Sequence, residues 1–99
     1  MNTTISDAHR RFIDEDLHLS PRSRKTYDYA IRKFLEHVER DYGIDPQDDP
    51  VTKLAIEHVT NWVAHEMPAD LRPPEDISRM RTLQTQLAEV RKWYGYLAA

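Results

Sequence analysis

The sequence contains no cysteine, only two glycines and no long apolar run among its 99 residues. Without cysteine the chain cannot form a disulfide, a thiolate metal site or a cysteine nucleophile. The N-terminal stretch lacks the apolar region of a secretory signal, and no apolar run approaches the ~18 residues that a transmembrane helix needs. We therefore expect neither secretion nor membrane insertion, and a cytoplasmic location is the default expectation.

The sequence also lacks the short motifs of enzymes and metal sites. It has no glycine-rich phosphate loop, no G-x-S-x-G and no H-E-x-x-H. His58 and His65 share one helical face, but two turns separate them by roughly 10 Å, which is too far for one metal ion. We expect no metal, no cofactor and no catalysis by this chain alone.

Helical periodicity is the main positive signal. Apolar residues recur with a period near 3.6 between the prolines and glycines, and no segment keeps a period of two. The pattern predicts one all-α domain spanning residues 1–99, folded as a compact four-helix bundle. The four helices are expected at about 4–17, 21–42, 52–66 and 76–98.

Several residues are typical of helix ends. Thr4 suits the N-cap of the first helix, and Ser20 followed by Pro21 suits the start of the second. Gly43 suits the left-handed residue that ends the second helix. The residues expected to face the core are Ile5, Ala8, Phe12, Leu17, Tyr27, Ala30, Ile31, Phe34, Leu35, Val38, Tyr42, Ile56, Val59, Trp62, Val63, Ile77, Met80, Leu83, Leu87, Val90, Trp93 or Tyr94, and Leu97.

Proteins that bind nucleic acids usually carry a net positive charge, so the net charge of −3 at first argues against such a partner. The charge is, however, distributed unevenly along the chain. Residues 1–19 carry −2 and residues 20–42 carry +2. Residues 43–76 carry −6 and residues 77–99 carry +3. The second and fourth helices are therefore basic, and the segment between them is acidic.

The bases lie where helix electrostatics do not favour them. Arg22, Arg24 and Lys25 fall in the first turn of the second helix, and Arg79 and Arg81 fall near the start of the fourth. The helix dipole favours acids at this end, and a bound phosphate would reverse the unfavourable interaction. Solvated side chains without a partner are the alternative. Hydroxyl and amide side chains that could bind bases or phosphates accompany the cations: Ser23, Thr26, Thr82, Thr85 and Gln86.

Two segments match patterns of a known family. Residues 23–34, with Tyr27, Ile31 and Phe34, fit S/T-x-x-x-Y-x-x-x-L-x-x-F. Residues 82–97, T-L-Q-T-Q-L-A-E-V-R-K-W-Y-G-Y-L, fit T-x-x-x-x-L-x-x-[LV]-R-x-[FW]-Y-x-Y-L. From about residue 12 to residue 97 the chain thus resembles the N-terminal, SAM-like core-binding domain of tyrosine recombinases, the phage integrases.

The resemblance implies a fold and a function. In that family this domain forms one half of a C-shaped clamp on duplex DNA, and its second and fourth helices meet the major groove. Strand cleavage belongs to a separate catalytic domain, which these residues do not include. His37 and Arg40 match the family's catalytic H-x-x-R spacing, but they lie in the wrong domain. Ala55 departs from the Ser or Thr that often caps the third helix.

The sequence therefore predicts a DNA-binding module of an integrase-like protein, which is not itself an enzyme and is monomeric in isolation. Its expected partners are double-stranded DNA and the catalytic domain of the same parent protein. The alternative is a helical protein-interaction module whose acidic middle binds a basic partner. The expected DNA-binding residues are Arg22, Ser23, Arg24, Lys25, Thr26, Arg79, Arg81, Thr82, Thr85 and Gln86.

Overall fold

The computed structural model describes residues 3–16, 20–67 and 75–98. Across these ranges the chain is all-α and contains no β-strand, as the sequence predicts. Four α-helices form the bundle, joined by a π-helical turn η1 and a 3₁₀ turn η2. Their bounds are α1 Ile5–Arg11, η1 Phe12–Asp16, α2 Pro21–Tyr42, η2 Val51–Lys53, α3 Ile56–Glu66 and α4 Glu75–Ala98.

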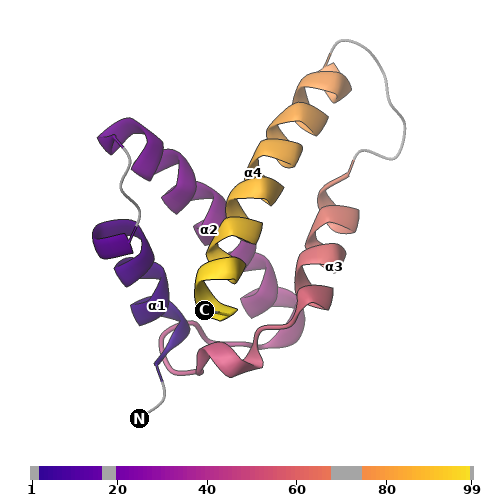
Figure 1. Cartoon of the computed structure of the whole chain (residues 1–99). Helices are drawn as coiled ribbons and strands as arrows, with labels where there is room; N and C mark the ends of the chain where they lie inside the picture. The colour runs from indigo at the N-terminus through magenta and orange to yellow at the C-terminus, as the bar shows by residue number, and fades with distance from the viewer. Residues whose placement is uncertain (1–2, 17–19, 68–74, 99) are drawn as a thin grey trace.

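The two longest helices, α2 and α4, cross at the centre of the molecule and share its most extensive helix–helix contact (Figure 1). Their N-terminal halves diverge from this crossing as two arms. On one flank α1 packs against both helices, because His9 lies against Asp28 of α2 and Trp93 of α4. On the other flank α3 is joined to α2 by a contact between Asn61 and His37.

The ends of α2 are those that the sequence predicts. Ser20 is the N-cap, and its Oγ accepts a hydrogen bond from the Ser23 N–H at 3.3 Å. Pro21 is the first helical residue. Gly43 ends the helix in the left-handed region, at φ 66°, and its N–H donates to the Glu39 carbonyl at 3.1 Å.

The first helix is shorter than predicted. Thr4 caps it as expected, because its Oγ1 accepts a hydrogen bond from the Asp7 N–H at 3.2 Å. The α-helical pattern ends at Arg11, however, and continues as a π-helical turn to Asp16. Leu17, the last residue expected to face the core here, lies outside the described residues.

The third helix begins at Ile56, so the predicted start at residue 52 is wrong. Residues 51–53 form a 3₁₀ turn instead. The Val51 N–H donates to the Thr3 carbonyl at 3.1 Å, and this hydrogen bond holds the turn against the N-terminal residues. Ala55 is the N-cap and has no side-chain acceptor. His58 supplies part of a cap, because its Nδ1 accepts the Ala55 N–H at 3.0 Å.

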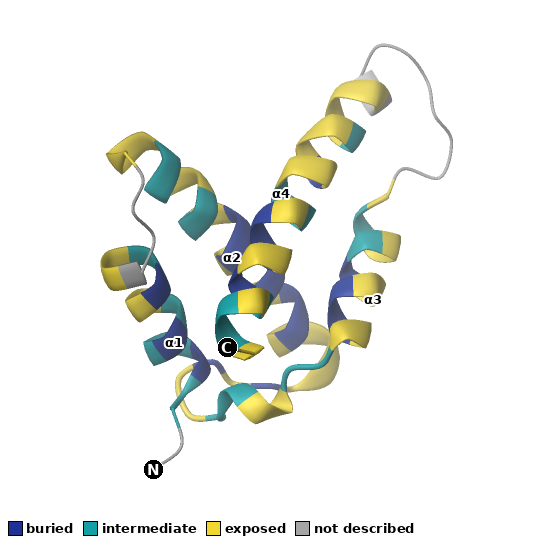
Figure 2. Ribbon diagram, viewed as in Figure 1, coloured by how far each residue is buried: buried dark blue, intermediate teal, exposed yellow. Residues whose placement is uncertain are grey.

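The core lies where the helices meet (Figure 2). Three predicted core residues are nevertheless exposed: Tyr42 at 41%, Ile56 at 64% and Ile77 at 40%. They are the last residue of α2, the first residue of α3 and a residue in the first turn of α4. At each of these helix ends, the apolar stripe extends beyond the end of the neighbouring helix that would otherwise cover it. The fully buried apolar side chains include Ile5, Phe12, Ile31, Phe34, Val38, Trp62, Val90 and Trp93.

No helix among the described residues combines the length and the apolar character that crossing a bilayer requires.

Candidate functional site

The two predicted basic clusters lie at the tips of separate arms. Arg22 and Lys25 are exposed at the start of α2, and Arg79 and Arg81 are exposed near the start of α4. Because the arms diverge, the structure does not merge the clusters into one patch (Figure 1). Arg24 differs from the others, since it is half-buried and its Nε has no acceptor within the described part of the chain.

Some of the hydroxyl groups beside the basic residues already form hydrogen bonds within their own helices. Thr26 Oγ1 donates to the Arg22 carbonyl at 3.1 Å, and Thr85 Oγ1 donates to the Arg81 carbonyl at 3.1 Å. Ser23 is half-buried and its Oγ accepts from the Ser20 hydroxyl at 3.2 Å. A hydroxyl that donates within the helix still has free acceptor positions. Thr26 and Thr85 are exposed, so they remain available to a donor from outside.

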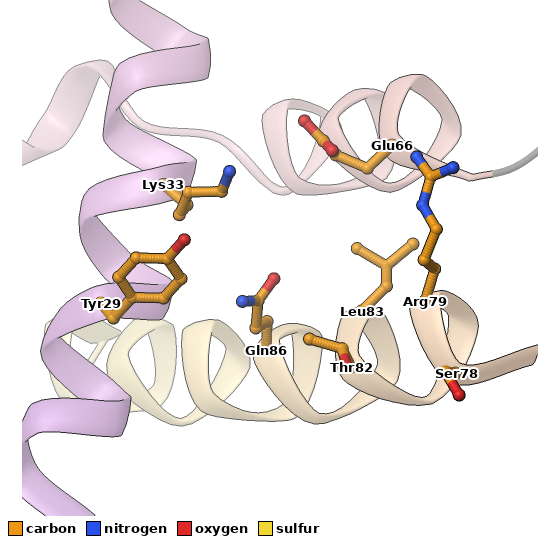
Figure 3. Close-up of a pocket in the computed structure, with 8 residues that line it drawn as sticks. All are labelled: Tyr29, Lys33, Glu66, Ser78, Arg79, Thr82, Leu83 and Gln86. Atoms are coloured by element: carbon orange, nitrogen blue, oxygen red, sulfur yellow. The ribbon is translucent and has the colours of Figure 1, made fainter. Parts of the chain in front are cut away.

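A hollow of about 340 Å³ lies between α2, α3 and α4, and we refer to it as the three-helix hollow (Figure 3). It brings together three of the predicted residues, Arg79, Thr82 and Gln86. The Gln86 amide and the Lys33 ammonium point toward its open centre (Figure 3). Its lining is completed by Tyr29, Lys33, Glu66, Ser78 and Leu83.

Tyr29 and Lys33 were not among the predicted site residues. Tyr29 is 51% exposed, and the Lys33 Nζ lies 5.9 Å from the centroid of its ring. The signal for both was present in the sequence: Arg22, Thr26, Tyr29 and Lys33 recur at intervals of three or four residues. They therefore follow one stripe along α2. The predicted cluster at the helix start is the beginning of a longer polar face.

The remaining predicted residues of α4 lie on a different flank of that helix. Arg81 and Thr85 line a second, more open hollow of about 670 Å³ between α2 and α4. We call it the Glu89 cleft, because Glu89 lies among its lining residues. The predicted residues of α4 are thus divided between two hollows. The lining of the Glu89 cleft consists of Tyr27, Arg81, Gln84, Thr85, Ala88 and Glu89.

Glu89 is the unexpected residue of this region. Its side chain is only 6% exposed, and its Oε1 is buried without a hydrogen-bond partner among the described residues. Burial raises the pKa of the Glu89 carboxyl. Sequence reasoning missed it because glutamate is rarely fully buried.

The buried histidine of the H-x-x-R sequence has partners that account for its position. His37 Nε2 lies 3.0 Å from Asn61 Oδ1, and His37 Nδ1 lies 3.2 Å from Asp41 Oδ2. The ring is buried between α2 and α3, whereas Arg40 is exposed and bonds to Asp41. Within the part of the chain that the structure covers, no three His, Asp or Glu side chains are grouped to hold a metal ion.

Two carboxylates of the acidic middle segment stabilise their own loop. Asp45 Oδ1 accepts the Gln47 N–H at 2.9 Å, and Asp49 Oδ2 accepts the Asp45 N–H at 2.8 Å. Asp49 also lies 2.9 Å from the Lys53 ammonium. The backbone hydrogen bond from Asp45, together with Lys53, lowers the pKa of the Asp49 carboxyl. These two acids are therefore part of the loop structure rather than freely solvated charges.

No protein-family model matches the chain, and comparison with curated proteins and with solved structures finds no significant match. Its function is inferred from its own residues and their geometry.

Proposed function

We propose that the chain is the DNA-binding module of a tyrosine recombinase or integrase-like protein. In this proposal α2 and α4 hold duplex DNA during site-specific recombination or integration, and strand cleavage is performed by a different domain. The observation that carries the proposal is the placement of exposed cations in the first turn of α2 and in the second turn of α4, near the starts of the two crossed helices. The resemblance of both helices to the recombinase patterns supports the same conclusion.

Phosphate is the chemical group that suits these two helix starts. The free N–H groups and the dipole of a helix N-terminus attract an anion, and guanidinium groups there add charge-assisted hydrogen bonds. Arg22 and Lys25 would bind phosphates from one arm, and Arg79 and Arg81 from the other. A duplex offers phosphates along both edges of its major groove, so two separated arms can each reach one edge.

The groups between the arms would face the groove. Thr82 and Gln86 line the three-helix hollow on the α4 side, and Lys33 and Tyr29 line it on the α2 side. Hydroxyl and amide groups bind base edges as well as phosphates, and Lys33 adds a further cation. The stripe from Arg22 to Lys33 would thus continue the contact toward the crossing of the helices.

The proposal predicts which amide resonances shift when DNA binds and which cationic side chains contribute to the affinity. Titration with duplex DNA at low salt should shift the amide resonances at the starts of α2 and α4. The double variant Arg22→Ala/Arg81→Ala should lose roughly tenfold or more in affinity, because each charge-assisted phosphate contact is worth over ~1 kcal/mol. Fluorescence anisotropy with a labelled duplex measures this loss.

Arg40→Ala is the matched control, since Arg40 is an exposed arginine at the opposite end of α2. It removes one positive charge without touching either arm, and its affinity should stay within about twofold of the wild type. Unchanged resonances at both helix starts, or an equal loss in Arg40→Ala, would show that the arms are not the DNA-binding surface.

A protein-interaction module remains the second candidate, because residues 43–76 carry a net charge of −6. Asp48 and Glu57 are exposed in this segment, and their carboxylates take no part in the side-chain hydrogen bonds that the structure shows for the Asp45–Asp49 turn. If a basic partner binds here, Asp48→Asn/Glu57→Gln should abolish binding of a basic peptide. Arg22→Ala/Arg81→Ala should leave that binding intact.

A further inference from the structure

Glu89 combines three properties that are unfavourable for a carboxylate. It lines an open cleft, its side chain is 6% exposed, and its Oε1 has no hydrogen-bond partner among the residues that the structure describes. Tyr27 and Ala88 contribute the apolar part of the cleft lining. A buried charge without a partner is costly, and a carboxyl group in such a place favours its neutral form.

The charged and titratable groups around the cleft come from three helices. Arg81 lines the cleft on α4, and the Lys92 Nζ lies 5.7 Å from the centroid of the Tyr27 ring. On α1, His9 contacts Trp93, one turn beyond Glu89, and its Nε2 lies 2.8 Å from Asp28 of α2. Burial is the cause of the raised pKa of the Glu89 carboxyl.

We propose that DNA binding at the Glu89 cleft is coupled to the uptake of one proton by the Glu89 carboxylate. The inference rests on the proposed function, because Arg81 and Thr85 of this cleft are among the residues assigned to DNA. The proton comes from hydronium in the solvent, so one O–H bond of hydronium breaks and one O–H bond forms on Glu89.

The physical cause is the charge that the ligand brings. Phosphates held by Arg81 and Thr85 would place a negative potential over the mouth of the cleft that Glu89 lines. Like charges favour the neutral form of an acid, so binding raises the affinity of Glu89 for its proton. By linkage, the proton then raises the affinity of the protein for DNA. The protonated acid also gains an O–H donor, which the anionic form lacks.

The test compares the pH dependence of DNA affinity in three proteins at constant ionic strength between pH 5 and pH 8. Wild-type affinity should rise as the pH falls, by about tenfold for each unit by which DNA raises the pKa of Glu89. Glu89→Gln mimics the protonated acid, so it should bind more tightly at pH 7 and show a smaller pH dependence. Glu36→Gln is the matched control, because Glu36 is exposed on α2 and its loss changes the net charge equally.

The proposal is overturned if Glu89→Gln and Glu36→Gln have the same affinity and the same pH profile. A second measurement needs no variant: the ¹³C resonance of the Glu89 carboxyl, titrated in the free wild-type protein and in its DNA complex. An upward shift of the titration midpoint on binding supports the proposal, and an unchanged midpoint overturns it. Absence of DNA binding in all three proteins at every pH instead overturns the proposed function, and the inference with it.

Discussion

At the scale of single residues, the backbone conformation favours glycine at position 43 but would favour a residue with a side chain at position 95. Gly43 has φ 66°, a region in which a side chain is strained, whereas Gly95 lies inside α4 with open space around the position of a Cβ. Gly43→Ala should lower the free energy of unfolding by about 1 kcal/mol. Gly95→Ala should raise it by up to about 1 kcal/mol, because alanine favours the helix. Urea denaturation measures both, and changes of the same sign would contradict this account.

The burial of single residues also shows which core positions the sequence predicts correctly and which it does not. Periodicity placed Phe34 in the core correctly, because a large apolar side chain on the inner stripe has only one favourable environment. It left Trp93 and Tyr94 as alternatives, and the structure buries Trp93 fully and Tyr94 partly. It placed Ile56 and Ile77 there wrongly, because spacing does not reveal where a neighbouring helix ends. Glu89 could not have been found, since its burial depends on how α2 and α4 cross.

At the scale of elements, His9 is one of the side chains that hold α1 in place, beside the buried Ile5 and Ala8. His9 packs against Trp93 and lies 2.8 Å from Asp28, so this one side chain joins α1 to both central helices. Burial lowers the pKa of His9, and the opposing effect of Asp28 does not compensate. The folded protein therefore holds His9 in its neutral form more strongly than the unfolded chain does.

This shift predicts a pH dependence of stability with a definite sign. The unfolded chain protonates His9 near its ordinary pKa of 6.5, above the pKa in the folded state. The stability that neutral His9 provides is thus complete above pH ~6.5 and is lost as the pH falls toward the folded pKa. Urea unfolding of wild type and His9→Gln between pH 5 and pH 7.5 should show a larger loss in the wild type. Equal losses in the two proteins would exclude this role for His9.

Helix boundaries show which local signals carry enough information for prediction. The bounds of α2 follow from Ser20, Pro21 and Gly43, each of which restricts its own backbone. The start of α3 does not, because Ala55 has no capping group and the cap comes from His58 in the next turn. The 3₁₀ turn before it depends on a hydrogen bond from Val51 to Thr3, a long-range contact that no local pattern reveals.

At the scale of the whole molecule, the crossing of α2 and α4 determines how the charge is presented. The net charge of −3 is compatible with DNA, because residues 20–42 and 77–99 carry +2 and +3 whereas residues 43–76 carry −6. The sequence predicted this division and the identity of both basic helices. It did not predict that the arms diverge, since this depends on the packing angle. The division of the α4 residues between two flanks follows from spacing alone, because Gln86 is seven residues from Arg79 whereas Arg81 is only two residues from it.

The same arrangement sets the expected dependence of DNA affinity on salt. The four exposed cations near the helix starts, together with the half-buried Arg24, would displace about five counterions, so log affinity should fall against log salt with a slope of about −4 to −5. Arg22→Ala/Arg81→Ala removes two of these contacts, one from each arm, and should reduce the magnitude of the slope by about 2. Fluorescence anisotropy between about 50 and 200 mM KCl covers the range in which this term is large. A slope near zero would mean that neither arm binds phosphate. A slope that the double variant leaves unchanged would place the phosphate contacts elsewhere on the protein.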